Sequence, residues 1–436
     1  MATAVSIDPR PEVEEALALC PDVPAEATVK AALLASGIAF DDEAIAAVTA
    51  AKRKSYFIFS FDFVTPGQGV ALPEEIRLSG GPLALAPTIV SVRHNPHSPW
   101  RVGVDGAGRP VLRAGGEAYA GVELPPIPPY YGATTSAGKP IIDIAPTIQW
   151  GFLVYLAVFR SCQYFNTHEQ CRFCDMNHNY AEQRGRRDYY TGVKEVDEVV
   201  EAMDAIASGD VAGETKAYTM TGGAVRSPIR GHDEADFYAR YVEAIEARHP
   251  GRWLSKVVTQ ALPLAGVRRL REAGTTIYHP NFEVWDPSLF EVYCPGKSAD
   301  IGRCEWIRRT LDAADVFGAA HVVPNFVAGI ELARPHGFAT VDEAIASTRE
   351  GIAFFMSHGI TPRFTTWCPE PATPLGAANP RGVPLAYHVR LLATYREVLA
   401  ENGLSAPAGY GPSGAGRAVF SVSPLMDALD PEPAAP

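Results

Sequence analysis

The sequence predicts an α/β protein whose main part is a partial or complete (β/α) barrel of the TIM type, preceded by a helical and β-rich N-terminal module. After about residue 150, short apolar segments alternate with helix-like segments, and such βα units imply a parallel sheet with right-handed crossovers. Several helical segments stop at a glycine, which satisfies the left-handed position that closes a helix. The expected strands are residues 152–159, 217–221, 253–259, 275–285, 321–330 and 361–367.

The chain is expected to divide into four parts. Apolar residues at helical spacing assign residues 1–54 to an N-terminal helical segment. Residues 55–147 are expected to form a small β-rich module, because turn-forming residues separate short apolar runs at 56–59, 89–92, 100–102 and 111–112. The barrel is expected over residues 148–404. Residues 405–436 are rich in Ala, Pro and Gly, and we expect a C-terminal tail that is partly disordered.

Composition and charge exclude several classes of protein. The chain has 436 residues and a formal net charge of −12, and so acidic a chain is a poor nucleic-acid binder. The longest apolar stretch, residues 150–159, is half of the roughly 20 residues that a membrane-spanning helix needs. Residues 1–15 lack the basic and apolar regions of a signal peptide. We therefore expect a cytoplasmic protein without nucleic-acid or membrane partners.

Three of the seven cysteines form the strongest functional signal. Cys162, Cys171 and Cys174 follow the first barrel strand with the spacing C-x8-C-x2-C, at the strand end where such barrels place active sites. Three thiolates can hold a [4Fe–4S] cluster with one iron left without a protein ligand. Two alternatives remain open: a structural zinc site completed by His168 or His178, or three unrelated buried thiols.

The cysteine loop, with Phe173 just before its last cysteine, resembles the signature of radical S-adenosylmethionine (SAM) enzymes. That family usually has the spacing C-x3-C-x2-C, so the first gap departs from the pattern. Gly222 and Gly223 are similar to the family's Gly-Gly-Glu element, which holds the amino group of SAM, although Ala224 stands in place of the glutamate.

Two later strand ends extend the resemblance. Asn281 and Glu283 are similar to a polar site for the ribose or carboxylate of SAM. Asn325 and Gly329 belong to a segment that resembles the element packed against adenine. The region 294–331 is most similar to the biotin-synthase-like branch of the family.

The resemblance implies a function and its cofactors. The three cysteines would ligate the [4Fe–4S] cluster, and reductive cleavage of S-adenosyl-L-methionine would give a 5′-deoxyadenosyl radical that abstracts hydrogen from a small-molecule substrate. An electron donor such as flavodoxin or ferredoxin would be a partner. No catalytic side chain is assigned beyond the cluster. The competing hypotheses are a zinc-stabilised (Cys3His) binding or scaffold protein on a barrel fold, and a zinc hydrolase with Glu169 as base.

Overall fold

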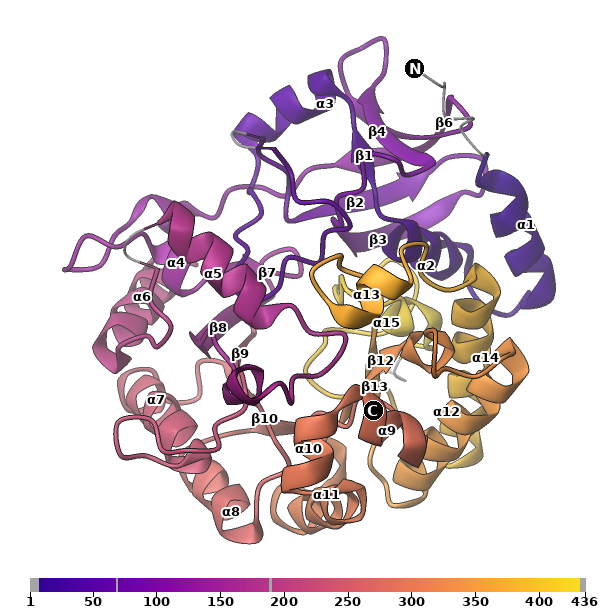
Figure 1. Cartoon of the computed structure of the whole chain (residues 1–436). Coiled ribbons are helices and arrows are strands. Elements are labelled where there is room, and N and C mark those ends of the chain that lie inside the picture. Colours follow the sequence, from indigo (N-terminus) through magenta and orange to yellow (C-terminus); the bar gives the residue numbers. More distant parts are fainter. Residues whose placement is uncertain (1–7, 68–69, 188–189, 432–436) are drawn as a thin grey trace, which may run out of the picture.

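Six parallel strands, each followed by a helix, form the main part of the molecule (Figure 1). The computed structural model describes residues 8–67, 70–187 and 190–431, without the side chains of Asn166 and Thr167. The strands are β8 (Leu153–Phe159), β9 (Ala217–Gly222), β10 (Leu254–Thr259), β11 (Ile277–Pro280), β12 (Asn325–Ala328) and β13 (Arg363–Thr366). All six predicted strands are therefore present, and the last three are shorter than predicted.

The strands make a partial barrel. Strands β8 to β11 pair in order in one parallel sheet, whose outer edge is the short antiparallel β7 (Thr147–Ile148). Strands β12 and β13 pair in parallel with each other, and parallel bridges at Tyr278–Val322 and Glu283–Phe326 connect the region of β11 to β12. Within the described residues no bridge joins β13 to β7 or β8, so the barrel is open on that side.

An outer ring of helices covers the strands (Figure 1). One long helix follows each strand in turn: α6 (Val196–Gly209), α7 (Glu234–Arg248), α8 (Leu264–Glu272), α11 (Arg303–Phe317), α12 (Val341–Ser357) and α14 (Leu385–Glu401). Gly274, Gly318, Gly359 and Gly403 have positive φ angles after four of these helices, which confirms the predicted closures. Shorter helices lie in the connections: α4 (Ile141–Ile144), α5 (Met176–Arg186), α9 (Pro287–Tyr293), α10 (Pro295–Asp300), α13 (Pro374–Ala378) and α15 (Leu425–Ala428).

The N-terminal part packs three helices and a sheet against the barrel. The helices are α1 (Arg10–Leu19), α2 (Ala25–Ser36) and α3 (Asp42–Ala47). The sheet has the order β1-β4-β5-β6-β2-β3, formed by β1 (Ala39–Phe40), β2 (Glu75–Gly80), β3 (Leu85–Ser91), β4 (Trp100–Val104), β5 (Pro110–Ala114) and β6 (Glu117–Glu123). Its apolar core continues into Leu385 and Val389 of α14, so this part shares a core with the barrel.

One predicted strand in this region is wrong. Residues 56–59 do not form a strand, because Tyr56 adopts a positive φ of 50° and the chain bends there. Phe57 and Phe59 instead line the cavity inside the barrel. The apolar run is buried against the barrel opening and not by pairing in a sheet.

Residues 405–431 of the expected C-terminal tail pack against the rest of the chain, whereas residues 432–436, the last residues of that tail, lie outside the described residues. The N–H of Ser91 donates to the carbonyl of Ser421, and the N–H of Thr366 donates to the carbonyl of Val422. The buried ion pair between Lys30 and Asp427, at 2.7 Å, connects α15 to α2. The segment therefore packs beside β13, where it adjoins the open side of the barrel.

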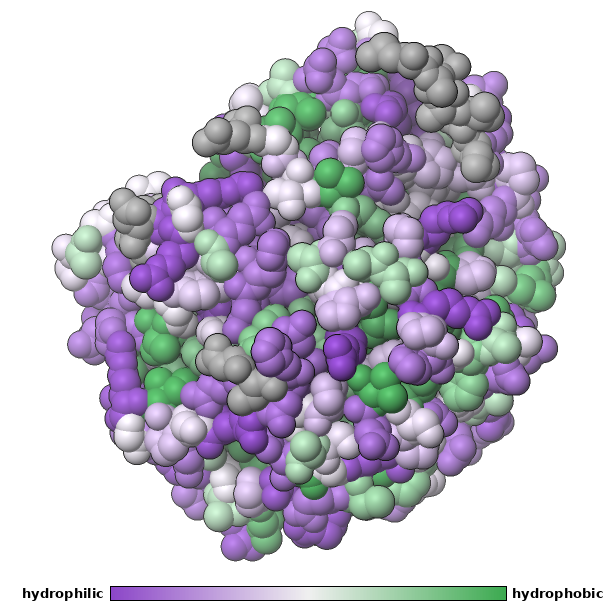
Figure 2. Space-filling model, viewed as in Figure 1, coloured by the Kyte–Doolittle hydropathy of each residue, from purple (hydrophilic) through white to green (hydrophobic). Residues whose placement is uncertain are grey.

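In the described part of the chain, no helix has both the length and the apolar character needed to cross a membrane. On the face shown in Figure 2, hydrophilic residues dominate and apolar ones occur in small groups. Five short 3-10 turns complete the fold: Val48–Ala50, Pro129–Gly132, Gln163–Thr167, Ala319–His321 and Ile330–Leu332.

Candidate active site

The interior of the barrel is a cavity lined by both polar and apolar side chains. Successive side chains of a strand point to opposite faces, so alternate residues of each strand face the barrel axis. Barrel interiors of this type are commonly filled by branched apolar side chains. Here the inward positions are mostly polar, and they line a cavity with about 1740 Å³ of empty space that opens to solvent. The strand residues that line it include Tyr155, Thr219, Thr221, Lys256, Val258, His279, Asn325, Val327, Arg363 and Thr365.

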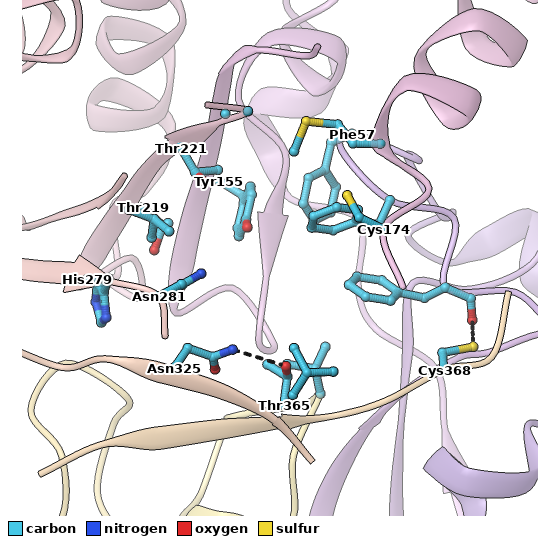
Figure 3. Close-up of a pocket in the computed structure, with 18 of the residues that line it drawn as sticks. Phe57, Tyr155, Cys174, Thr219, Thr221, His279, Asn281, Asn325, Thr365 and Cys368 are labelled. Carbon is cyan, nitrogen blue, oxygen red and sulfur yellow. Dashed lines mark hydrogen bonds between the residues drawn. The ribbon is translucent and has the colours of Figure 1, made fainter. Parts of the chain in front are cut away.

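Figure 3 shows the arrangement of side chains in this cavity. Thr219 and Thr221 of β9, His279 of β11 and Asn325 of β12 face a common space, and Cys174 lies across that space from them. Asn281, just beyond β11, belongs to the same wall. The side-chain oxygens of Asn281 and Asn325 are buried without a hydrogen-bond partner. Unsatisfied buried acceptors are costly in a native structure, so these two indicate a ligand.

All three predicted cluster ligands line this cavity. Cys162, Cys171 and Cys174 lie on the loop that follows β8, and a 3-10 turn at Gln163–Thr167 takes up the long first gap of the motif. Burial raises the pKa of Cys162 to about 11, and burial followed by the charges of the other two thiols raises the pKa of Cys174. A contact with the thiol of Cys294 lowers the pKa of Cys171. The three thiols are thus close enough to influence one another's ionisation.

The two glycines predicted beside this loop allow its close approach to β9. A Cβ on Gly223 would overlap the carbonyl of Ser161 and the Cα of Cys162, and a Cβ on Gly222 would lie 2.5 Å from the carbonyl of Phe159. The N–H of Gln163 donates to the carbonyl of Ala224, which holds the two segments together. Both glycines line the cavity, so they combine a packing role with exposure to a ligand.

Glu283 faces the cavity beside the thiols and is ion-paired. Its carboxylate lies 2.5 Å from the Nζ of Lys297, which also donates to the carbonyl of Asn281 at 3.0 Å. Burial opposes the charge of Lys297, but the attraction of Glu283, Cys171 and Cys294 outweighs it and raises the pKa of this lysine. Glu283 is therefore held in place by a buried cation, an interaction that the sequence did not predict.

A second buried carboxyl group was not predicted. Glu234, the first residue of α7, lines the cavity, and burial raises its pKa to about 7. Gln260 donates to its carboxylate at 2.9 Å, and the hydroxyl of Tyr164 donates to Gln260 at 2.6 Å. Gln260 continues the inward alternation of Lys256 and Val258 on β10, a signal that sequence reasoning could have used.

Not every predicted residue lies in this wall. Phe173 lines the cavity, but Gly329 is absent from the described lining. Gly329 has a φ of 115°, and its N–H donates to the buried carboxylate of Glu331, which also accepts from Thr348. Its observed contacts are therefore structural. His168 and His178, the predicted fourth zinc ligands, are exposed and absent from the described lining.

A zinc ion and a [4Fe–4S] cluster make different demands on the residues that bind them. Within residues 8–67, 70–187 and 190–431, no three His, Cys, Asp or Glu side chains converge to hold a metal ion. A tetrahedral zinc ion needs four ligands about 2.0–2.3 Å from one centre. In a [4Fe–4S] cluster the thiolates bind different irons and are more widely spaced. Three thiols on one loop that line the same cavity have the donor chemistry of such a cluster, with one iron left without a protein ligand.

Comparisons with known proteins give distant structural similarities. No family model and no curated protein matches the chain. Among solved structures, methylornithine synthase (PylB) is similar with a TM-score of 0.40 and 14% identity, over 58% of this chain and 70% of that one. Coproporphyrinogen III oxidase (HemN) from Escherichia coli, described as a radical SAM enzyme, has a TM-score of 0.35 and 12% identity, over 58% and 52%.

The cobalamin-dependent S-adenosylmethionine radical enzyme OxsB has a TM-score of 0.30 and 15% identity, over 56% of this chain and 31% of that one. The chain thus spans only about half of HemN and a third of OxsB. Similarities this distant carry no functional argument.

Proposed function

We propose that this chain is a radical SAM enzyme. The observation that carries the proposal is that three cysteines on one loop line a cavity inside a partial (β/α) barrel. Cys162, Cys171 and Cys174 would hold a [4Fe–4S] cluster. When bound, the cluster and S-adenosyl-L-methionine would supply a 5′-deoxyadenosyl radical that takes hydrogen from a small-molecule substrate.

The chain's own residues would bind and orient the cofactor. Gly222 and Gly223 leave their backbone open to the cavity beside Cys162, where a ligand's amino group can reach carbonyl oxygens. Asn281 and Asn325 each hold an unpartnered buried oxygen for a donor on the ligand. Lys297 fixes the carboxylate of Glu283 at 2.5 Å, so that it accepts hydrogen bonds without turning. Phe173 contributes apolar surface next to the cluster cysteines.

The proposal also covers the branch of the family, the electron donor and the location of the protein. The finer assignment to the biotin-synthase-like branch rests on the region 294–331 alone. Within that region, the N–H of Gly329 is used in a structural hydrogen bond to Glu331. An external electron donor such as flavodoxin or ferredoxin would reduce the cluster, and a cytoplasmic location would keep it reduced.

Metal content and SAM cleavage test the proposal together. The protein is purified without oxygen, reconstituted with iron and sulfide, and assayed for 5′-deoxyadenosine after reduction with dithionite in the presence of SAM. We expect about four irons per chain and release of 5′-deoxyadenosine. Cys171→Ala should lose both, whereas Cys304→Ala, at an exposed cysteine away from the cavity, should keep both. A colourless protein that retains one zinc ion would refute the proposal and favour the zinc-stabilised scaffold.

A further inference from the structure

The cavity holds two cations that have no anionic partner. Four Lys and Arg side chains line it. Lys54 pairs with Asp62 at 2.5 Å, and Lys297 pairs with Glu283 at 2.5 Å. Lys256 and Arg363 form no ion pair with any described residue. Two of the four basic side chains thus have a carboxylate partner and two do not, although all four line the same cavity. The cavity as a whole therefore does not explain why Lys256 and Arg363 lack a partner.

Lys256 and Arg363 lie together at the base of the cavity. The Nζ of Lys256 is 3.6 Å from the ring centroid of Tyr410, and the guanidinium of Arg363 is 5.2 Å from the same centroid. Lys256 is 1% exposed, and its Nζ donates to the carbonyl of Gly409 at 2.9 Å. The Nε of Arg363 is buried without a hydrogen-bond partner. We call Lys256 and Arg363 the cationic floor.

No neighbouring group compensates this charge. Nδ1 of His279 on β11 donates to the carbonyl of Val323, and burial together with Arg363 and Lys256 lowers the pKa of this histidine, which keeps it neutral. Tyr410 packs on the floor from the C-terminal segment, and burial raises its pKa, so it is also neutral. Burial lowers the pKa of Lys256, and Arg363 lowers it further. An uncompensated buried cation is costly unless an anion pairs with it.

The floor lies at a defined depth below the thiols. Lys256 pairs in register with Thr219, which precedes Gly222 by three residues on β9. At about 3.3 Å per residue, the floor is about 10 Å below the strand ends that carry the cysteine loop. Asn325 pairs with Arg363, so one unpartnered side-chain oxygen lies next to the floor. This depth suits a small molecule with an anionic group at one end.

We propose that the cationic floor binds the carboxylate or phosphate group of a small-molecule substrate, which places the rest of that molecule between the floor and the three cysteines. Calling this ligand the substrate rests on the proposed function, but the anion site does not. A bound anion favours the protonated form of Lys256, which then supplies a point charge, and Arg363 supplies a planar set of donors that matches an oxyanion. The bound anion supplies the missing partner for both cations.

The test measures anion binding directly on the full chain. Inorganic phosphate and acetate are titrated separately at constant ionic strength, with chloride as the reference anion, and binding is followed by calorimetry and by the shift in Tm. We expect at least one of the two anions to bind. Lys256→Met and Arg363→Met should each raise its dissociation constant at least tenfold. Arg363→Lys should retain part of the binding, and Lys216→Met, which removes an exposed cation, should change nothing.

The outcomes separate this inference from the proposed function. Binding that is unchanged in both floor variants, or no binding of either anion, would overturn the cationic floor. A preference for phosphate over acetate, or the reverse, identifies which oxyanion the substrate carries. The titrations are run on iron-free and reconstituted protein. Anion binding by a protein that never cleaves SAM would refute the proposed function only, whereas SAM cleavage without an anion site would refute the floor only.

Discussion

Replacing Lys256 by methionine should stabilise the free protein, whereas the same change at Lys30 should destabilise it. Both lysines are completely or almost completely buried, and each donates to a backbone carbonyl, of Gly409 and of Phe420 respectively. They differ in one respect. Lys30 pairs with Asp427 at 2.7 Å, and Lys256 has no carboxylate partner among the described residues. The pair of variants therefore isolates the effect of an unpaired buried charge.

The magnitudes follow from the contacts. Lys30→Met leaves Asp427 buried with Thr88 as its remaining side-chain partner, and breaking a buried ion pair costs about 3–5 kcal/mol. Lys256→Met removes a buried amino group whose charged form destabilises the fold by several kcal/mol. The variant also loses the hydrogen bond to the carbonyl of Gly409, which costs about 1–3 kcal/mol. We expect a net gain of about 0–3 kcal/mol. With an unfolding entropy near 2.1 cal/mol/K per residue over 436 residues, 1 kcal/mol shifts Tm by about 1 °C.

The assay is thermal unfolding of both variants and the wild type at several pH values, without added phosphate or carboxylate. The folded-state pKa of Lys256 is lowered, so below the ordinary value of 10.5 the unfolded chain binds a proton that the folded chain does not. Wild-type stability relative to Lys256→Met must therefore rise with pH. The advantage of the variant should be largest below the lowered pKa of Lys256, decrease as the pH rises above it, and vanish near pH 10.5. A loss of Tm in Lys256→Met as large as in Lys30→Met would refute the reasoning, because Lys256 would then have a partner within the protein.

Two further predictions concern the upper part of the cavity. Gly223→Ala should abolish iron retention after reconstitution, because the added Cβ overlaps Ser161 and Cys162. The control Gly185→Ala in α5, where space is open, should retain iron. Equal iron content in the two variants would contradict the close packing at Gly223. Glu234→Gln should raise stability at pH 8 by about 3 kcal/mol, because the folded pKa of about 7 exceeds the ordinary 4.5 and stability is lost as pH rises through this range. The gain should fall below about 1 kcal/mol at pH 5 in the same unfolding assay, and a gain independent of pH would rule out titration of Glu234 as its cause.

The elements that the sequence predicted are those whose signals are local. Each barrel strand lies in a short segment rich in apolar residues, and a glycine follows four of the six helices, so all six βα units could be identified without knowledge of their partners. The cysteine loop is equally local, since its three ligands lie within thirteen residues. These features depend on periodicity and spacing, which a single sequence displays.

The features that were missed depend on contacts between distant segments. Phe420, Leu425 and Met426 are buried because residues 405–431 pack beside β13 and α2. The Ala-, Pro- and Gly-rich sequence around them does not predict this burial. Phe57 and Phe59 had the composition of a strand, but they are buried in the barrel opening. Composition predicts a preference for burial, and the fold decides what buries the side chain.

The cationic floor was not predicted, although the sequence contains a signal for it. Thr219 and Thr221 alternate with apolar residues, and so do Lys256, His279 and Arg363 with their strand neighbours. In a buried parallel strand both faces are normally apolar, so polar residues at every second position mark the face that meets water or a ligand. Strands with such a face do not fill the barrel interior with apolar side chains. The same pattern that opens the cavity therefore also supplies its charges, in a chain whose net charge is −12. An acidic protein whose cavity base carries two basic groups without an ion-pair partner among the described residues is suited to draw an anion inward, to a position about 10 Å below the strand ends that lead into the cysteine loop.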